Sequence, residues 1–169
     1  MLQTIELCQK HNLWVLSDEC YEQFIYDTEY SSLATLTEDN QRILTFQSCS
    51  KTYAMTGWRI GYIAGREDLV KGMSKLQGQS TSCPNSIAQY AAIEALTGPQ
   101  DEIHIMRTKF KARRDMVVNS LNTIDGIECD LPGGAFYVFP NISQLLNKTF
   151  ENQRIKTPND LSLSLLNKY

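Results

Sequence analysis

The strongest chemical signal in the sequence is the stretch SCSKTYAMTGWR, residues 48–59. It places Lys51 among small polar side chains, just after an apolar run, with Arg59 eight residues further on. A lysine forms an imine readily once burial lowers the pKa of its ammonium group. Hydroxyls and a guanidinium suit a phosphate, to which arginine can donate two hydrogen bonds. A generic S-x-x-K would be better interpreted as a surface lysine in a Ser/Thr loop, but the full stretch is far more specific.

A carboxylate and a phenol precede this lysine. Asp18 follows the apolar run at residues 13–16 and lies 33 residues before Lys51, and Tyr21 comes three residues later. An isolated D-x-x-Y pair is better interpreted as a turn aspartate and a packed tyrosine. Because this pair precedes the lysine stretch, we interpret both residues as part of the same site, and the turn-and-packing interpretation becomes the minor one.

The lysine stretch resembles the motif of class I aminotransferases, which are fold-type I enzymes that use pyridoxal 5′-phosphate (PLP). It is most similar to the bacterial aspartate/prephenate aminotransferase branch, where S-K-x-x-x-M-T-G-W-R-I-G-Y is typical. The resemblance runs from Ile5 to beyond Phe139. Further blocks in the same order carry it: residues 17–21 (SDECY), 79–84 (QSTSCP) and 132–137 (PGGAFY).

This resemblance implies roles for residues around a PLP ring. Lys51 is expected to form the imine link and to shuttle a proton during the reaction. Asp18 is expected to pair with the ring nitrogen, which makes the ring an electron sink. Tyr21 is expected to donate a hydrogen bond to the ring oxygen.

The phosphate of PLP is expected to be held by Ser48, Ser50 and Arg59, again by resemblance. Arg59 has an alternative interpretation as a strand arginine paired with an acidic neighbour. Phe136 and Tyr137 either reach the substrate side of the cleft or pack in the core.

Continuous apolar runs predict strands buried on both faces of a helix-covered sheet, at residues 13–16, 42–46 and 58–64. Apolar spacing predicts helices over residues 2–11, 68–77, 85–96, 99–122 and 159–166. Pro-Gly-Gly at 132–134 predicts a turn between strands at 127–129 and 135–139. The expected fold class is α/β, with a mixed, mostly parallel sheet. By resemblance, residues 1–98 are the C-terminal part of the PLP-binding large domain, and residues 99–169 are the interdomain helix and part of the small α+β domain.

Composition argues against several partners. Charged residues make up 21% of the 169 residues and the net charge is −3, so no basic field would attract nucleic acid or an anionic membrane. The densest basic cluster, residues 111–114 (KARR), is interpreted as the solvated face of a helix. Five cysteines without a C-x-x-C pair indicate reduced thiols of a cytoplasmic protein and no metal site. The N-terminal residues include Glu6 and Lys10 and no continuous apolar run, so we do not expect them to be a signal peptide.

The implied reaction moves an amino group from an amino acid, aspartate or a similar dicarboxylic substrate, to a 2-oxo acid such as 2-oxoglutarate. Family members are homodimers more than twice as long as this chain. The phosphate-binding turn, the aromatic residue stacked on PLP and the substrate-binding arginine would lie outside it. We therefore expect a fragment that is inactive alone. The alternatives are another fold-type I PLP enzyme, such as a C–S lyase, a ligand-sensing regulator with an aminotransferase-like domain, or a non-catalytic remnant.

Overall fold

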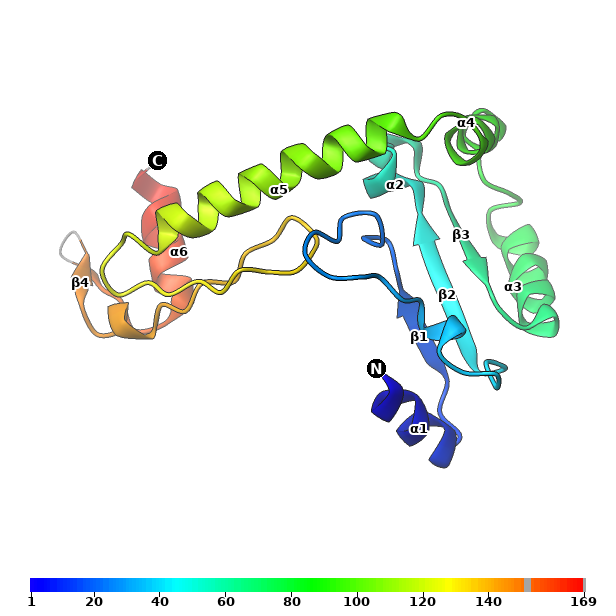
Figure 1. The fold of residues 1–169 in the computed structure, drawn as a ribbon, viewed down its shortest axis with the longest axis horizontal. Helices are drawn as coiled ribbons and strands as arrows, with labels where there is room; N and C mark the ends of the chain where they lie inside the picture. Colours follow the sequence, from blue (N-terminus) through cyan, green and yellow to red (C-terminus); the bar gives the residue numbers. More distant parts are fainter. Residues whose placement is uncertain (151–152, 169) are drawn as a thin grey trace. The chain divides into compact units, whose positions relative to one another are not determined.

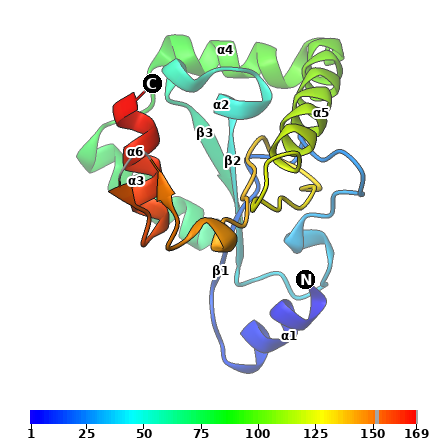
Figure 2. The same cartoon turned by 90° about the vertical axis from the view of Figure 1, so that its left-hand side faces the viewer.

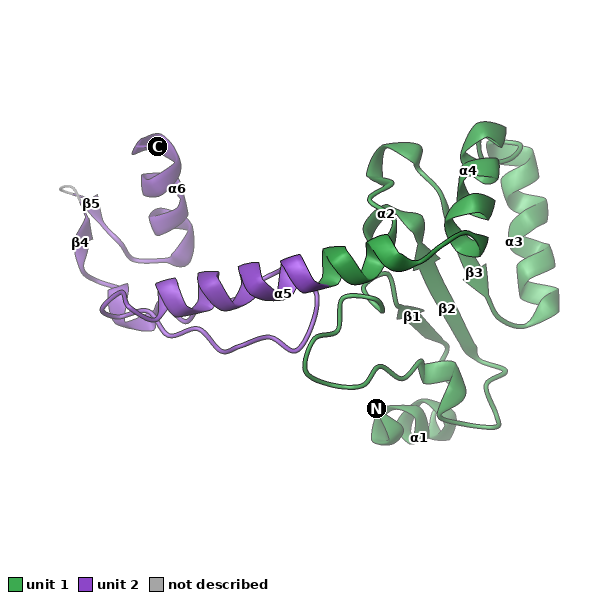
Figure 3. Ribbon diagram, turned by 45° about the horizontal axis from the view of Figure 1, so that its top comes forward, with its two compact units in different colours: residues 1–107 green, residues 108–169 purple. Residues whose placement is uncertain are grey.

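The computed structural model describes residues 1–150 and 153–168. The chain divides into two compact units, Met1–Arg107 and Thr108–Tyr169, coloured separately in Figure 3. The boundary between them falls inside helix α5 (Asp101–Leu121). No helix in the described part of the chain is long and apolar enough to cross a membrane.

The first unit is built on a three-stranded sheet in the order β1 (Val15–Asp18), β2 (Ile43–Ser48), β3 (Gly61–Ala64). Strands β1 and β2 are parallel, with Asp18 opposite Phe46, whereas β2 and β3 are antiparallel, with Ser48 opposite Gly61 (Figure 1). The predicted mixed α/β arrangement is confirmed. The described sheet is not mostly parallel, because it contains one pair of each kind. The third predicted strand is shortened, because residues 56–58 form the 3-10 turn η2 (Thr56–Trp58).

Helices α1 (Leu2–Lys10), α3 (Glu67–Ser80) and α4 (Ser86–Thr97) form where the apolar spacing predicted them, whereas the short helix α2 (Cys49–Thr52) was not predicted. Helix α1 lies at the opposite end of the sheet from α2 (Figures 1 and 2). Helix α3 follows β3, and α4 comes next. The side chain of Asn85 accepts hydrogen bonds from the amides of Ile87 (2.9 Å) and Ala88 (3.3 Å) and so fixes the start of α4. A further 3-10 turn, η1 (Leu33–Thr35), lies between β1 and β2.

A small core attaches α2 to α4. Cys49, Met55 and Ala92 are buried together, and Tyr53 and Ile60 pack against them. Burying apolar surface in this way is the main force that holds a helix as short as α2 in place. The core therefore lies directly beneath the segment that carries Lys51.

The strands are less buried than their apolar sequences predict. All four residues of β3 are exposed, and Leu16 in β1 is 65% exposed. Helix α4 turns the small Ala88 and Ala92 inward, but Ile87 and Tyr90 are 68% and 77% exposed. The prediction of strands buried on both faces is therefore wrong for β1 and β3, whereas β2 buries the successive residues Ile43 and Leu44.

The second unit contains the C-terminal part of α5, the 3-10 turn η3 (Ser143–Leu145), the paired strands β4 (Thr149–Phe150) and β5 (Gln153–Arg154), and helix α6 (Pro158–Lys168). The predicted helices over 99–122 and 159–166 are confirmed. The strands predicted at 127–129 and 135–139 are not formed in the described structure. Glu128 and Asn141 make an isolated antiparallel bridge, and Ala135 has a φ of +59°, which interrupts extended backbone.

The basic cluster at residues 111–114 was predicted to be solvated. Arg114 contradicts this prediction, because it is only 6% exposed. The Arg114 guanidinium donates to Oδ1 of Asp115 (2.7 Å) and to the carbonyl oxygen of Pro132 (2.7 Å). A buried arginine is tolerated when its donors are satisfied in this way. The prediction missed this because Pro132 approaches only in the folded chain.

Candidate cofactor site

Two of the expected site residues lie at the same edge of the sheet because β1 and β2 run parallel. Asp18 is the last residue of β1, and Lys51 lies three residues after the end of β2. The amide of Glu19 donates to the carbonyl oxygen of Phe46 (2.9 Å), so the β1–β2 pairing continues past Asp18. In open α/β sheets, ligands bind outside the carboxyl ends of the parallel strands. The topology therefore brings the carboxylate and the lysine to the edge where a cofactor would be expected.

Side chains from both strand ends meet around Lys51. Its Nζ lies 5.8 Å from the centroid of the Tyr21 ring. Burial raises the pKa of the Cys20 thiol, as do a hydrogen bond with Asp18 and the charge of Asp18, whereas the charge of Lys51 lowers it. Asp18 and Lys51 therefore both lie close to Cys20.

Helix α2 orients the lysine and the two serines. The side-chain oxygen of Ser48 accepts a hydrogen bond from the amide of Ser50 (3.1 Å), which caps the helix. Cys49 and Thr52 are buried beneath it. The remaining residues of this turn are half-buried, namely Ser48, Ser50 and Lys51.

A backbone hydrogen bond joins the residue after Arg59 to the start of helix α2. The amide of Cys49 donates to the carbonyl oxygen of Ile60 (3.3 Å), which joins the start of α2 to the residue after Arg59. The exposed Arg59 side chain donates from Nη1 to the carbonyl oxygen of Thr56 (3.0 Å), an acceptor that is not a carboxylate. A hollow of about 620 Å³ opens beside it. The hollow is lined by Ala54, Gly57, Trp58, Arg59, Asn85, Ile87 and Ala88.

The backbone of Arg59 is in the left-handed region, with φ +53° and ψ +49°. This conformation costs a residue with a Cβ roughly 1–2 kcal/mol. Such strain at a non-glycine residue is a reason to look for a functional role, because a strained conformation persists only where its surroundings impose it.

Sequence reasoning missed Glu19, which lies between Asp18 and Tyr21. Its carboxylate is buried and accepts hydrogen bonds from Ser17, Ser32 and Tyr30. The available signal was an acidic residue two positions after Ser17, because residues two apart lie on the same face of extended backbone, here at the end of β1 and just after it.

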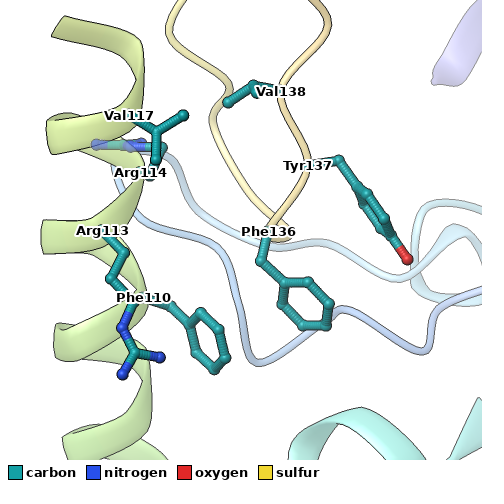
Figure 4. A pocket seen from close by; sticks show the side chains of 7 residues that line it. All are labelled: Phe110, Arg113, Arg114, Val117, Phe136, Tyr137 and Val138. Atoms are coloured by element: carbon teal, nitrogen blue, oxygen red, sulfur yellow. The ribbon is translucent and has the colours of Figure 1, made fainter. Parts of the chain in front are cut away.

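A separate pocket in the second unit, of about 220 Å³, lies between α5 and the segment after the Pro-Gly-Gly turn (Figure 4). The ring of Phe136 stacks on Phe110, with centroids 4.9 Å apart, and Arg113 lies 5.4 Å from the Phe110 centroid. Tyr137 points away from α5 and is 61% exposed. Phe136 therefore packs on Phe110 while remaining 36% exposed at the pocket, so its two predicted alternatives both stay predictions.

The residue types at the sheet edge fit PLP chemically. The group contains an amine, a carboxylate, a phenol and hydroxyls, which match a carbonyl carbon, a ring nitrogen, a ring oxygen and a phosphate. The Arg59 guanidinium, which bonds the carbonyl oxygen of Thr56, is not brought into contact with this group by any hydrogen bond of the described residues. Within the described residues, no cluster of three or more His, Cys, Asp or Glu side chains could hold a metal ion. All five cysteines are free thiols.

The chain is similar to proteins of known family. The model of the family "Aminotransferase class I and II" matches residues 1–169. The aspartate aminotransferase of Rhizobium meliloti (strain 1021) is 45% identical over 166 residues, which cover 96% of this chain and 40% of the relative. The aspartate/prephenate aminotransferase of Cereibacter sphaeroides is 46% identical over 147 residues, covering 85% and 37%.

A solved structure supports the same relationship. The crystal structure of the Rhizobium meliloti aspartate aminotransferase matches with a TM-score of 0.91 and 44% identity, over 96% of this chain and 41% of that one. The prediction of fold type I is confirmed by this match. The chain spans about 40% of the length of the relatives it matches. It belongs to the class I and II aminotransferase family.

Proposed function

We propose that this chain is part of a PLP-dependent aminotransferase that moves an amino group between an amino acid and 2-oxoglutarate, with aspartate or a similar dicarboxylic amino acid as the donor. The observation that carries the proposal is the meeting of Lys51 and Asp18 at one sheet edge, with Lys51 Nζ over the ring of Tyr21. Relatives named aspartate aminotransferase and aspartate/prephenate aminotransferase support the substrate class. We call the longer protein that would contain this chain the complete enzyme.

The chain's own residues would bind PLP at both of its ends. The hydroxyls of Ser48 and Ser50 and the guanidinium of Arg59 would hold the phosphate by charge-assisted hydrogen bonds. The Asp18 carboxylate would keep a proton on the ring nitrogen, and the Tyr21 hydroxyl would donate to the ring oxygen.

When bound, PLP supplies a ring that accepts the electron pair released at Cα of the amino acid. Lys51 would hold the cofactor covalently at rest. The Lys51 amine would also take up and return the proton at Cα of the amino acid.

In the complete enzyme we assign residues 1–98 to the PLP-binding large domain and residues 99–169 to the interdomain helix and part of the small domain. We also propose that the complete enzyme is a homodimer. The exposed apolar side chains of α4 and β3 support a larger assembly, since such surfaces are normally covered.

The lysine assignment is tested by Lys51→Ala in the complete enzyme. Without the amine, the visible absorbance of bound PLP should be lost, and borohydride should no longer attach the cofactor to the protein. Lys71→Ala is the matched control, because Lys71 is exposed in α3 and pairs with Glu67. Peptide mapping of the wild-type protein should place the label on Lys51. A label that persists in Lys51→Ala would refute the assignment.

A further inference from the structure

Glu19 is a buried carboxylate directly between two residues that we propose to contact the PLP ring. It is 8% exposed, whereas its neighbour Asp18 is exposed, because successive residues of a strand face opposite ways. Its amide donates to the carbonyl oxygen of Phe46 (2.9 Å), and its carbonyl accepts from the amide of Glu22 (3.0 Å). The backbone of Glu19 is therefore held on both sides.

The Glu19 carboxylate accepts four hydrogen bonds. Oε1 accepts from the hydroxyls of Ser17 (2.8 Å) and Ser32 (2.9 Å) and from the amide of Leu33 (3.3 Å). Oε2 accepts from the hydroxyl of Tyr30. Three of these donors belong to residues 30–33, so the carboxylate ties that segment to the end of β1.

All four partners are donors, so the site favours an ionised carboxylate. Burial alone would raise the pKa of Glu19, but the hydrogen bonds from Tyr30, Ser17, Ser32 and Leu33 outweigh it and the pKa is lowered. Burial, the hydrogen bond to Glu19 and the charge of Glu19 raise the pKa of Tyr30, which keeps its phenol protonated as a donor. The anchor is thus a negative charge that is fully hydrogen-bonded.

The turn that follows Glu19 carries Tyr21. The amide of Cys20 donates to Oδ1 of Asp18 (3.3 Å), and the amide of Phe24 donates to the carbonyl oxygen of Tyr21 (2.9 Å). These bonds are local, whereas the Glu19 carboxylate connects the turn to a segment more than ten residues away.

We propose that Glu19 is a positioning residue: its carboxylate, anchored by residues 17 and 30–33, holds Asp18 and Tyr21 in the orientations that the PLP ring requires. This inference rests on the proposed function, since it concerns the same site. Glu19 itself contacts neither cofactor nor substrate in this proposal and acts through its two neighbours.

The test compares Glu19→Gln with wild type in the complete enzyme. The amide keeps the shape of the side chain but turns an NH2 group toward donors. We expect kcat for the aspartate half-reaction to fall about 10- to 100-fold, with a smaller change in KM, because small misplacements of reacting groups have effects of this size. The pH midpoint of the visible absorbance of bound PLP should also shift, because Asp18 and Tyr21 tune the charge of the ring. Tyr30→Phe should act in the same direction with a smaller effect.

Glu29→Gln is the matched control, because Glu29 is exposed in the same loop and should leave all readouts unchanged. Hydrogen exchange of the apo protein adds a readout without cofactor, since the amides of Cys20 and Tyr21 should exchange faster in Glu19→Gln. A Glu19→Gln variant that is less stable but keeps the wild-type kcat, absorbance midpoint and exchange rates would overturn the positioning role. If the wild-type protein shows no PLP attached to Lys51, the proposed function fails first and the positioning role fails with it.

Discussion

At the scale of single residues, Asp18 is the clearest electrostatic element of the proposed site. Asp18→Asn in the complete enzyme keeps the shape but removes the charge that would hold a proton on the ring nitrogen. We expect the amino-acid half-reaction to slow by about 100-fold or more, the scale seen when one preorganised polar partner is lost, while PLP stays bound. Stopped-flow absorbance would measure the half-reaction. Asp39→Asn, at an exposed position, is the control, and near-normal kinetics in Asp18→Asn would remove Asp18 from the catalytic set.

Two substitutions of Arg59 can separate its proposed role in binding the PLP phosphate from the strain in its backbone. Arg59→Gly removes the guanidinium and also relieves the left-handed conformation, which glycine adopts without steric cost. Arg59→Ala removes the guanidinium but keeps the strain. Because one charge-assisted hydrogen bond contributes about 1.5–3 kcal/mol, both variants should weaken PLP binding roughly tenfold or more.

The two arginine variants should differ in the free energy of unfolding of the apo protein, where Arg59→Gly should be the more stable one. Equilibrium titration with PLP and urea denaturation would measure the two effects. An unchanged dissociation constant for PLP in both variants would show that Arg59 is structural.

At the scale of elements, the β2–β3 pair positions the segment that precedes β3 and carries Arg59. A Cβ on Gly61 would lie 2.5 Å from the carbonyl oxygen of Gln47, a backbone atom that cannot move without separating the two strands. Gly61→Ala should therefore lower the free energy of unfolding of the complete enzyme by about 1–3 kcal/mol, the usual cost of overpacking. It should also weaken PLP retention, because the start of β3 moves.

Gly72→Ala is the control for this substitution. Gly72 lies in α3, and a Cβ there meets no atom within 4 Å. Alanine should be neutral or stabilise the helix by about 0.5–1 kcal/mol. Urea denaturation of both variants would measure the difference, and equal stabilities would show that the β2–β3 approach can relax.

At the scale of the whole molecule, we expect the 169-residue chain expressed alone to aggregate and to lack transaminase activity. Large apolar side chains are exposed, among them Leu76 (72%), Ile87 (68%) and Tyr90 (77%). In the described sheet, β1 and β3 each pair with β2 only, so each presents an edge that can pair with another chain. Light scattering and an assay of aspartate with 2-oxoglutarate would test both expectations. Turnover near that of a family enzyme with all segments present would show that the missing segments are dispensable.

The sequence alone was sufficient for the longer helices and the family. Helices over 2–11, 68–77, 85–96 and 99–122 follow from apolar spacing, which depends on near neighbours in the chain. The resemblance rests on the order and spacing of residues 48–59 and a few other blocks. It led to a fold type and a family that the comparisons confirm, whereas the roles of Lys51, Asp18 and the other site residues remain predictions.

Other features were decided by the tertiary structure, because they depend on residues that are distant in sequence. The hydrogen bonds to Glu19 come largely from residues 30–33, and no local sequence pattern predicts these contacts. Arg114 is buried because the carbonyl of Pro132 comes within 2.7 Å, against a sequence that favours a solvated face. The strands expected beside the Pro-Gly-Gly turn do not form, because a strand needs a neighbour, and strand propensity alone does not supply one.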